Sequence, residues 1–275
     1  MSTDPTYLLV RADDIGSFHA ANEACMDVFT KGICRSVELM APCPWFPEAV
    51  KLLQEQPHYD VGVHLTLTSE WENMKWRPVS NAQSLVDDDG YFCHTYRKRN
   101  DTADPYPDRK PFCEIRWTPA DVEQELRAQI ELIRKHIPWV SHLTTHMGGL
   151  RDDPNFQGIV DRLVGEYGLA VDLKEHGFER WRGFGENNQA LTPVEKTQRL
   201  RENLEALAPG KWIFVDHPAY DTAETRSIYH IGYENVAMDR QGVTEAWTDP
   251  QVLAIIARRN IQLVSYADVK QGRCG

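Results

Sequence analysis

The sequence predicts an α/β protein, folded as a distorted or incomplete parallel (β/α) barrel of about seven strands. Strand-like and helix-like segments alternate along all 275 residues, which is the pattern of repeated βα units in a parallel sheet. The first strand is followed by a lone glycine, Gly16, and not by a G-x-G-x-x-G turn, so the barrel is favoured over a dinucleotide-binding sheet. No linker or internal repeat interrupts the alternation, and we expect residues 1–275 to form a single domain.

The elements are expected in the following order. Residues 7–10 are apolar and rich in strand formers, and residues 20–30 carry apolar side chains at helical spacing up to Gly32. Thr118 and Thr192 each precede a proline and, two residues further on, an acid, which is the pattern of a capped helix start. The remaining strands are predicted at 36–40, 60–67, 140–146, 169–173, 212–216 and 261–265, and the helices at 47–54, 118–137, 155–167, 192–207 and 248–259.

Residues 69–117 break this rhythm with a long polar segment that contains many aromatic residues. Insertions of this size in a compact domain are usually active-site lids, binding loops or disordered segments, and the aromatic content favours an ordered lid. Trp71 and Trp76 are candidates for stacking on a sugar ring, although tryptophans equally often cover a core. Both interpretations stay open from the sequence.

The composition excludes some partners. A formal charge of −11 argues against a nucleic acid or an anionic membrane, because both would repel the protein. No apolar run is long enough to span a bilayer, and the first residues lack a leader pattern. The six cysteines are scattered without a C-x-x-C pair, so we expect reduced thiols and a cytoplasmic protein. Whether it forms a homodimer stays open.

Four predicted strands end in residues capable of chemistry: Asp13-Asp14, His64, His146 and Asp216-His217. The carboxyl ends of parallel barrel strands gather at one face, so these residues should converge. One buried histidine alone is more often a core residue, but this combination indicates a metal or acid/base site. An Asp-His-His set with an open position suits zinc or another divalent first-row metal. His142, four residues before His146, is interpreted as a supporting or core histidine.

The same residues resemble the YdjC-type carbohydrate deacetylases, which include chitooligosaccharide deacetylases. The likeness extends over nearly the whole chain through the segments Arg11-Ala-Asp-Asp-Ile-Gly16, Gly62-Val-His-Leu-Thr-Leu-Thr68, Ser84-Leu-Val-Asp-Asp-Asp-Gly90, His142-Leu-Thr-Thr-His146, His217-Pro218, Thr248-Asp-Pro-Gln-Val252 and Leu263-Val-Ser-Tyr-Ala-Asp268. The resemblance implies a polysaccharide-deacetylase-like distorted barrel. It also implies one divalent metal ion, zinc or magnesium, and a small carbohydrate substrate.

By this resemblance Asp14, His64 and His146 are the metal ligands, Asp13 is the general base and His217 the general acid. The pattern alone does not distinguish the roles of the two aspartates. The substrate-binding candidates are Arg11, Trp71 and Trp76.

The chain departs from the family pattern in three places. Arg11 stands where the family usually has Asn, Met147-Gly148-Gly149 follows His146 in place of further histidines, and Ala219 follows Pro218 in place of Gly. The changed segment after His146 lies where relatives touch the sugar, so it bears on the substrate more than on the reaction.

The expected reaction is hydrolysis of the acetamide of an N-acetylated amino sugar or short oligosaccharide, with release of acetate. Two alternatives remain. One is a metal-dependent amidohydrolase or isomerase with a non-sugar substrate, and the other is a sugar- or metal-binding relative without catalysis.

Overall fold

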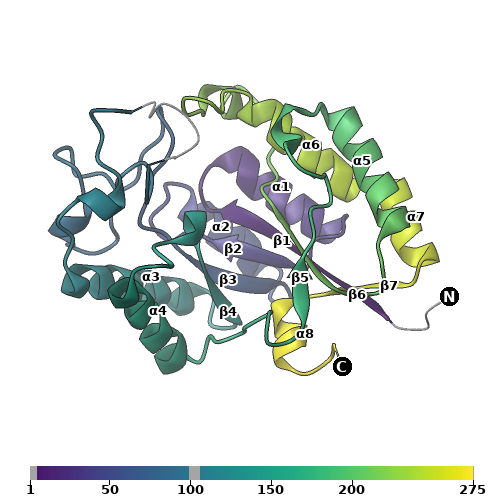
Figure 1. Cartoon of the computed structure of the whole chain (residues 1–275), viewed down its shortest axis with the longest axis horizontal. Helices are drawn as coiled ribbons and strands as arrows, with labels where there is room; N and C mark the ends of the chain where they lie inside the picture. Colours follow the sequence, from purple (N-terminus) through teal and green to yellow (C-terminus); the bar gives the residue numbers. More distant parts are fainter. Residues whose placement is uncertain (1–4, 99–105, 275) are drawn as a thin grey trace.

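The computed structural model describes residues 5–98 and 106–274, and its centre is a sheet of seven parallel strands (Figure 1). The order across the sheet is β4-β3-β2-β1-β6-β5, and β7 also pairs with β1. The strands are β1 (Thr6–Ile15), β2 (Ser36–Leu39), β3 (Asp60–Leu65), β4 (His142–Thr145), β5 (Phe178–Arg180), β6 (Gly210–Asp216) and β7 (Ile261–Val264). Within the described residues no ladder joins β4 to β5, so the barrel is open on that side. The prediction of an incomplete parallel barrel is confirmed.

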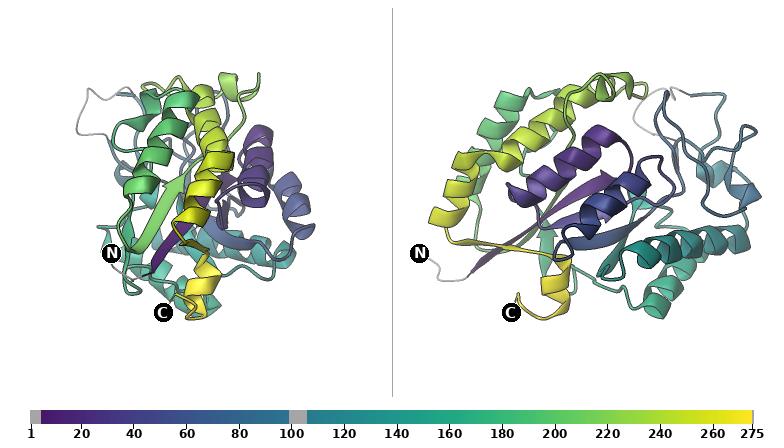
Figure 2. Two further views of the ribbon diagram at one scale, coloured as in Figure 1. Left: turned by 90° about the vertical axis from the view of Figure 1, so that its right-hand side faces the viewer. Right: turned by 180° about the vertical axis from the view of Figure 1, so that it is seen from behind.

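Helices cover the outside of the sheet, and α3 and α4 pack together on the β3–β4 side while α5, α6 and α7 pack beside β6 (Figures 1 and 2). Their apolar faces and the buried strand β1 form the main core. The helices are α1 (His19–Thr30), α2 (Phe46–Gln54), α3 (Pro119–His136), α4 (Pro154–Tyr167), α5 (Pro193–Ala206), α6 (Val236–Thr248), α7 (Pro250–Arg258) and α8 (Tyr266–Lys270). Within the described residues none of them is long and apolar enough to cross a membrane.

The predicted helix starts are present. Thr192 forms a complete capping box with Glu195, and Thr118 accepts a hydrogen bond from the backbone N–H of Asp121. The carboxylate of Asp121 does not return to Thr118 but accepts from the backbone N–H of Ser84. The start of α3 therefore also anchors the inserted segment.

One predicted strand is absent, and one helix was missed. The apolar residues 169–173 form no strand; Val171 and Leu173 pack against a small second core, and Asp172 accepts from the backbone N–H of Lys174 to begin a turn. The edge strand β5 lies further along, at Phe178–Arg180. The helix predicted at 248–259 is α7, but a second helix, α6, directly precedes it and was missed.

The described parts of the insertion, 69–98 and 106–117, are mostly irregular chain with two short 3₁₀ turns, Gln83–Leu85 and Phe112–Glu114. Its aromatic side chains are largely buried and pack with one another, as Tyr96 does edge-on against Phe112. Glu125 of α3 accepts hydrogen bonds from the backbone N–H groups of Val79 and Ser80 and from the Ser80 hydroxyl. These contacts hold the segment against the helix layer.

Candidate active site

A distortion at the end of β1 brings two adjacent carboxylates to the same place. Consecutive side chains on a regular strand point to opposite faces. Here the pairing between β1 and β2 shifts by one residue between Ala12 and Ile15, and Asp14 has a left-handed backbone with φ 74°. This is the geometry of a β-bulge, which redirects side chains. As a result both Asp13 and Asp14 line the same cavity.

Asp14, His64 and His146 converge at the carboxyl ends of β1, β3 and β4. One donor atom from each of the three side chains lies within 4.8 Å of the other two. Asp14 Oδ1 is 3.2 Å from Nδ1 of His146 and 3.8 Å from Nε2 of His64. Asp14 Oδ1 and His146 Nδ1 are buried and have no hydrogen-bond partner among the described residues. Buried polar atoms are rarely left unpaired, so this donor set fits a cation.

The other ring nitrogen of each histidine is held by a neighbour, as is usual for metal-binding histidines. His146 Nε2 lies 3.0 Å from Glu70 Oε2, and His64 Nδ1 lies 2.7 Å from the hydroxyl of Thr144. Burial, together with the nearby His146 charge, lowers the pKa of His64 to about 3, so this ring is neutral. Burial also acts to lower the pKa of His146, but the carboxylates of Glu70 and Asp14 outweigh it and raise the value to about 10.

Asp13 is fixed by Arg11. The guanidinium group donates from Nε and Nη2 to the two carboxylate oxygens at 2.7 and 2.9 Å, and from Nη1 to the hydroxyl of Tyr266 at 2.8 Å. A two-point pair of this kind sets the orientation of the carboxylate. Arg11 lines a separate cleft with Tyr266 and is not among the residues around Asp13's cavity.

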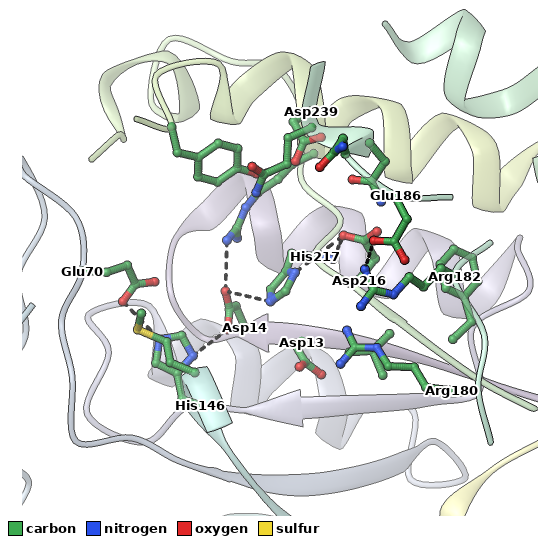
Figure 3. A pocket seen from close by; sticks show the side chains of 18 of the residues that line it. Asp13, Asp14, Glu70, His146, Arg180, Arg182, Glu186, Asp216, His217 and Asp239 are labelled. Atoms are coloured by element: carbon green, nitrogen blue, oxygen red, sulfur yellow. Dashed lines mark hydrogen bonds and ion pairs between the residues drawn. The ribbon is translucent and has the colours of Figure 1, made fainter. Parts of the chain in front are cut away.

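His217 directly follows β6 and faces Asp14 on the side away from His146 (Figure 3). Its Nε2 lies 3.9 Å from Asp14 Oδ2, and its Nδ1 lies 3.6 Å from Asp216. Burial opposes the charged ring, but the carboxylates of Asp14 and Asp216 outweigh that and raise the pKa of His217. The side chain is 39% exposed, so the ring can reach a bound molecule.

Arg240 is a further charged neighbour of Asp14. Its Nη2 lies 3.1 Å from Asp14 Oδ2, and its guanidinium group lies 5.1 Å from the ring centre of Trp71 and 5.7 Å from that of Phe18. Burial opposes ionisation of Asp14, yet the positive charges of His217, His146 and Arg240 hold the pKa of its carboxyl well below the usual value.

These groups border a cavity of about 640 Å³. Arg180 and Arg182, at and just beyond the end of β5, extend toward Asp13 and His217 from the opposite side (Figure 3). Met147 also lines the cavity; it is 44% exposed and has a left-handed backbone with φ 49°. The volume is typical of a site for a small molecule.

A sequence profile described as YdjC-like protein matches residues 7–258. The chain belongs to the YdjC-like family. A carbohydrate deacetylase from Geobacillus stearothermophilus is 25% identical over 271 residues, covering 96% of this chain and 98% of that protein. Carbohydrate deacetylase 1 from Listeria innocua is 29% identical over 267 residues, covering 95% and 99%. The crystal structure of an Enterococcus faecalis V583 protein has the same fold, with a TM-score of 0.72 and 22% identity over 96% of this chain and 99% of that one.

In this YdjC-like protein, most of the residues singled out from the sequence lie together. The five expected to act as ligands, base and acid all line the cavity: Asp13, Asp14, His64, His146 and His217. Trp71 lines it as well, although its side chain is almost fully buried and stacks on His230. Trp76 lies behind His146, and its indole N–H donates to the backbone of Thr68.

Two contacts of the donor set were missed by sequence reasoning. Glu70 is the first acid after β3, and this position was the only feature of the sequence that could have indicated its role. Arg240 lies in α6, the helix that the periodicity did not reveal.

Proposed function

We propose that this protein is a metal-dependent deacetylase that hydrolyses the acetamide of N-acetylated amino sugars or of short oligosaccharides that contain them. Membership of the YdjC-like family and the names of its relatives support the substrate class. The observation that carries the proposal is the convergence of Asp14, His64 and His146 beside a candidate base, Asp13, and a candidate acid, His217.

Asp14, His64 and His146 would hold one divalent ion, for which we propose zinc or magnesium. Two imidazoles in the set favour zinc, because magnesium prefers oxygen ligands. When bound, such an ion lowers the pKa of a water molecule and polarises the amide carbonyl group.

The protein's own residues then move the protons. Asp13, oriented by Arg11, accepts a proton from the attacking water as the new C–O bond forms. His217, whose pKa is raised by the carboxylates of Asp14 and Asp216, donates a proton to the amide nitrogen as the C–N bond breaks. The products are acetate and a free amine. Loss of the Asp13 proton to solvent and reprotonation of His217 restore the starting state.

The cavity wall supports a small carbohydrate as the substrate. Met147 offers an exposed apolar surface close to the donor set, and Arg180 offers hydrogen-bond donors on the far side, while Trp71 borders the cavity with a nearly fully buried ring. Cytoplasmic location and homodimer formation stay predictions, to be checked by cell fractionation and by light scattering.

The test combines metal analysis with product analysis. Purified protein should contain up to one divalent ion per chain, and the metal-loaded protein should release acetate from at least one N-acetylated mono- or oligosaccharide. Removal of the ion with a chelator should abolish turnover, and its return should restore it. Hydrolysis of other amides without any acetate release from sugars would favour the non-sugar alternative, and failure to bind any divalent ion would refute the proposal.

A further inference from the structure

A buried acid in β2, Glu38, lies behind the donor set and does not line the cavity. Its side chain is fully buried. One oxygen lies 2.6 Å from His142 Nε2, and the other accepts a hydrogen bond from the hydroxyl of Thr144. Arg11 Nε lies 3.9 Å away. A buried carboxylate needs such partners, because an unpaired one would be costly to desolvate.

The charge on Glu38 sets the direction of the hydrogen bonds around it. A ring nitrogen of His142 lies 2.6 Å from one Glu38 oxygen and the guanidinium group of Arg11 lies 3.9 Å from the same oxygen, a setting that favours the ionised carboxylate. An ionised carboxylate only accepts hydrogen bonds, so the Thr144 hydroxyl must give its proton to Glu38.

The next hydrogen bond in the chain then has only one direction. With its proton directed at Glu38, the Thr144 oxygen is left as an acceptor for His64 Nδ1, 2.7 Å away. A neutral imidazole carries one proton, so a proton on Nδ1 leaves the lone pair on Nε2. That is the nitrogen of His64 lying 3.8 Å from Asp14 Oδ1.

His146 shows the complementary arrangement. Its Nε2 contacts a carboxylate, Glu70, and its Nδ1 faces Asp14. The two histidines therefore offer opposite nitrogens to the same point. For His146, a carboxylate in direct contact determines which ring nitrogen faces Asp14. For His64, a carboxylate determines this through a hydroxyl group.

We propose that Glu38 is a positioning residue which, through the hydroxyl of Thr144, keeps His64 in the tautomer that presents Nε2 to the metal. The inference rests on the metal site in the proposed function. It also assigns a place to His142, which donates to Glu38 and helps to hold it, in keeping with a supporting role.

The first experiment measures the tautomer directly, without metal or substrate. In ¹⁵N-histidine-labelled, metal-free protein, NMR should show His64 with its proton on Nδ1. In Thr144→Val, which keeps the shape but removes the hydroxyl, the proton should redistribute toward Nε2, and Thr144→Ser should restore the wild-type state. Unchanged His64 signals in Thr144→Val would overturn the proposal, as would a proton on Nε2 in the wild type.

The second experiment measures affinity for Zn²⁺ by competition with a chelating dye. Glu38→Gln and Thr144→Val should each bind about 10–100-fold more weakly, the usual effect of removing a group that orients a metal ligand. The double variant should be no weaker than Thr144→Val alone, because Glu38 acts through that hydroxyl.

Thr145→Val is the matched control for this measurement. It removes a hydroxyl from the next residue of β4, where the alternation of a strand directs the side chain to the opposite face, and should leave affinity within about twofold. Additive losses of Zn²⁺ affinity in the double variant, or an equal loss of affinity in Thr145→Val, would reject the action of Glu38 through the Thr144 hydroxyl. Absence of Zn²⁺ binding by the wild type would refute the proposed function instead, while the tautomer measurement would still decide the role of Glu38.

Discussion

Metal binding at Asp14, His64 and His146 should release a proton, and the affinity should rise with pH. The raised pKa of His146, about 10, means that Nδ1 carries a proton in the metal-free protein at neutral pH. That proton must leave before the nitrogen can bind a cation. His64, with a pKa lowered to about 3, is already neutral and contributes no proton.

The free-energy cost of removing this proton follows from the difference between the pKa of His146 and the pH of the experiment. At pH 7 the gap is about three pH units, and each unit corresponds to about 1.36 kcal/mol, so deprotonation costs roughly 4 kcal/mol of binding free energy. The affinity should therefore rise roughly tenfold per pH unit between pH 6 and 9, and level off above the pKa of His146.

Calorimetry in buffers with different heats of ionisation counts the released protons. About one proton per Zn²⁺ is expected at pH 6, where a bound water still keeps most of its own protons. Glu70→Gln provides the matched comparison, because loss of that carboxylate lowers the pKa of His146, so the affinity of this variant should level off at a lower pH than that of the wild type. Binding without proton release at pH 6, or affinity independent of pH, would refute the assignment of His146 Nδ1 as a ligand.

Three further outcomes are expected from substitutions around the cavity. Asp13→Asn should keep metal content but lower kcat by about 10²–10⁴-fold, since it removes the proton acceptor; near-normal acetate release would exclude Asp13 as the base. His217→Asn should lower kcat by a similar factor for sugar acetamides but much less for an acetate ester with a good leaving group, and equal losses on both would argue against an acid role. Trp71→Ala should destabilise the fold by about 3–5 kcal/mol in urea denaturation, because its buried ring packs against Arg240; a loss below 1 kcal/mol would contradict that packing role.

The sequence predicts the strands and their functional ends well, because short apolar runs closed by Asp or His are local patterns. Those ends converge for a topological reason: all seven strands are parallel. The strand predicted at 169–173 failed because Val171 and Leu173 are partly buried by side-chain packing without a ladder. Helix α6 was missed because polar residues, among them Asp239 and Arg240, are buried within it and obscure the apolar period.

The supporting carboxylates were beyond prediction for a different reason. Glu38 and Glu70 sit in no local pattern, and their partners are far away in the chain: Thr144 lies 106 residues after Glu38, and His146 lies 76 residues after Glu70. Such contacts depend on which strands become neighbours, which a single sequence does not specify.

The bulge in β1 has a practical consequence for mutagenesis. The chain bends there only because position 14 accepts a left-handed backbone, which Asp and Asn tolerate far better than other residues with a side chain. Alanine at this position would delete a ligand and also favour straightening of the strand, turning Asp13 away. Only Asp14→Asn separates the two effects. A study that used Asp14→Ala alone would ascribe the whole loss of activity to the missing charge, although part of it would come from the straightened strand.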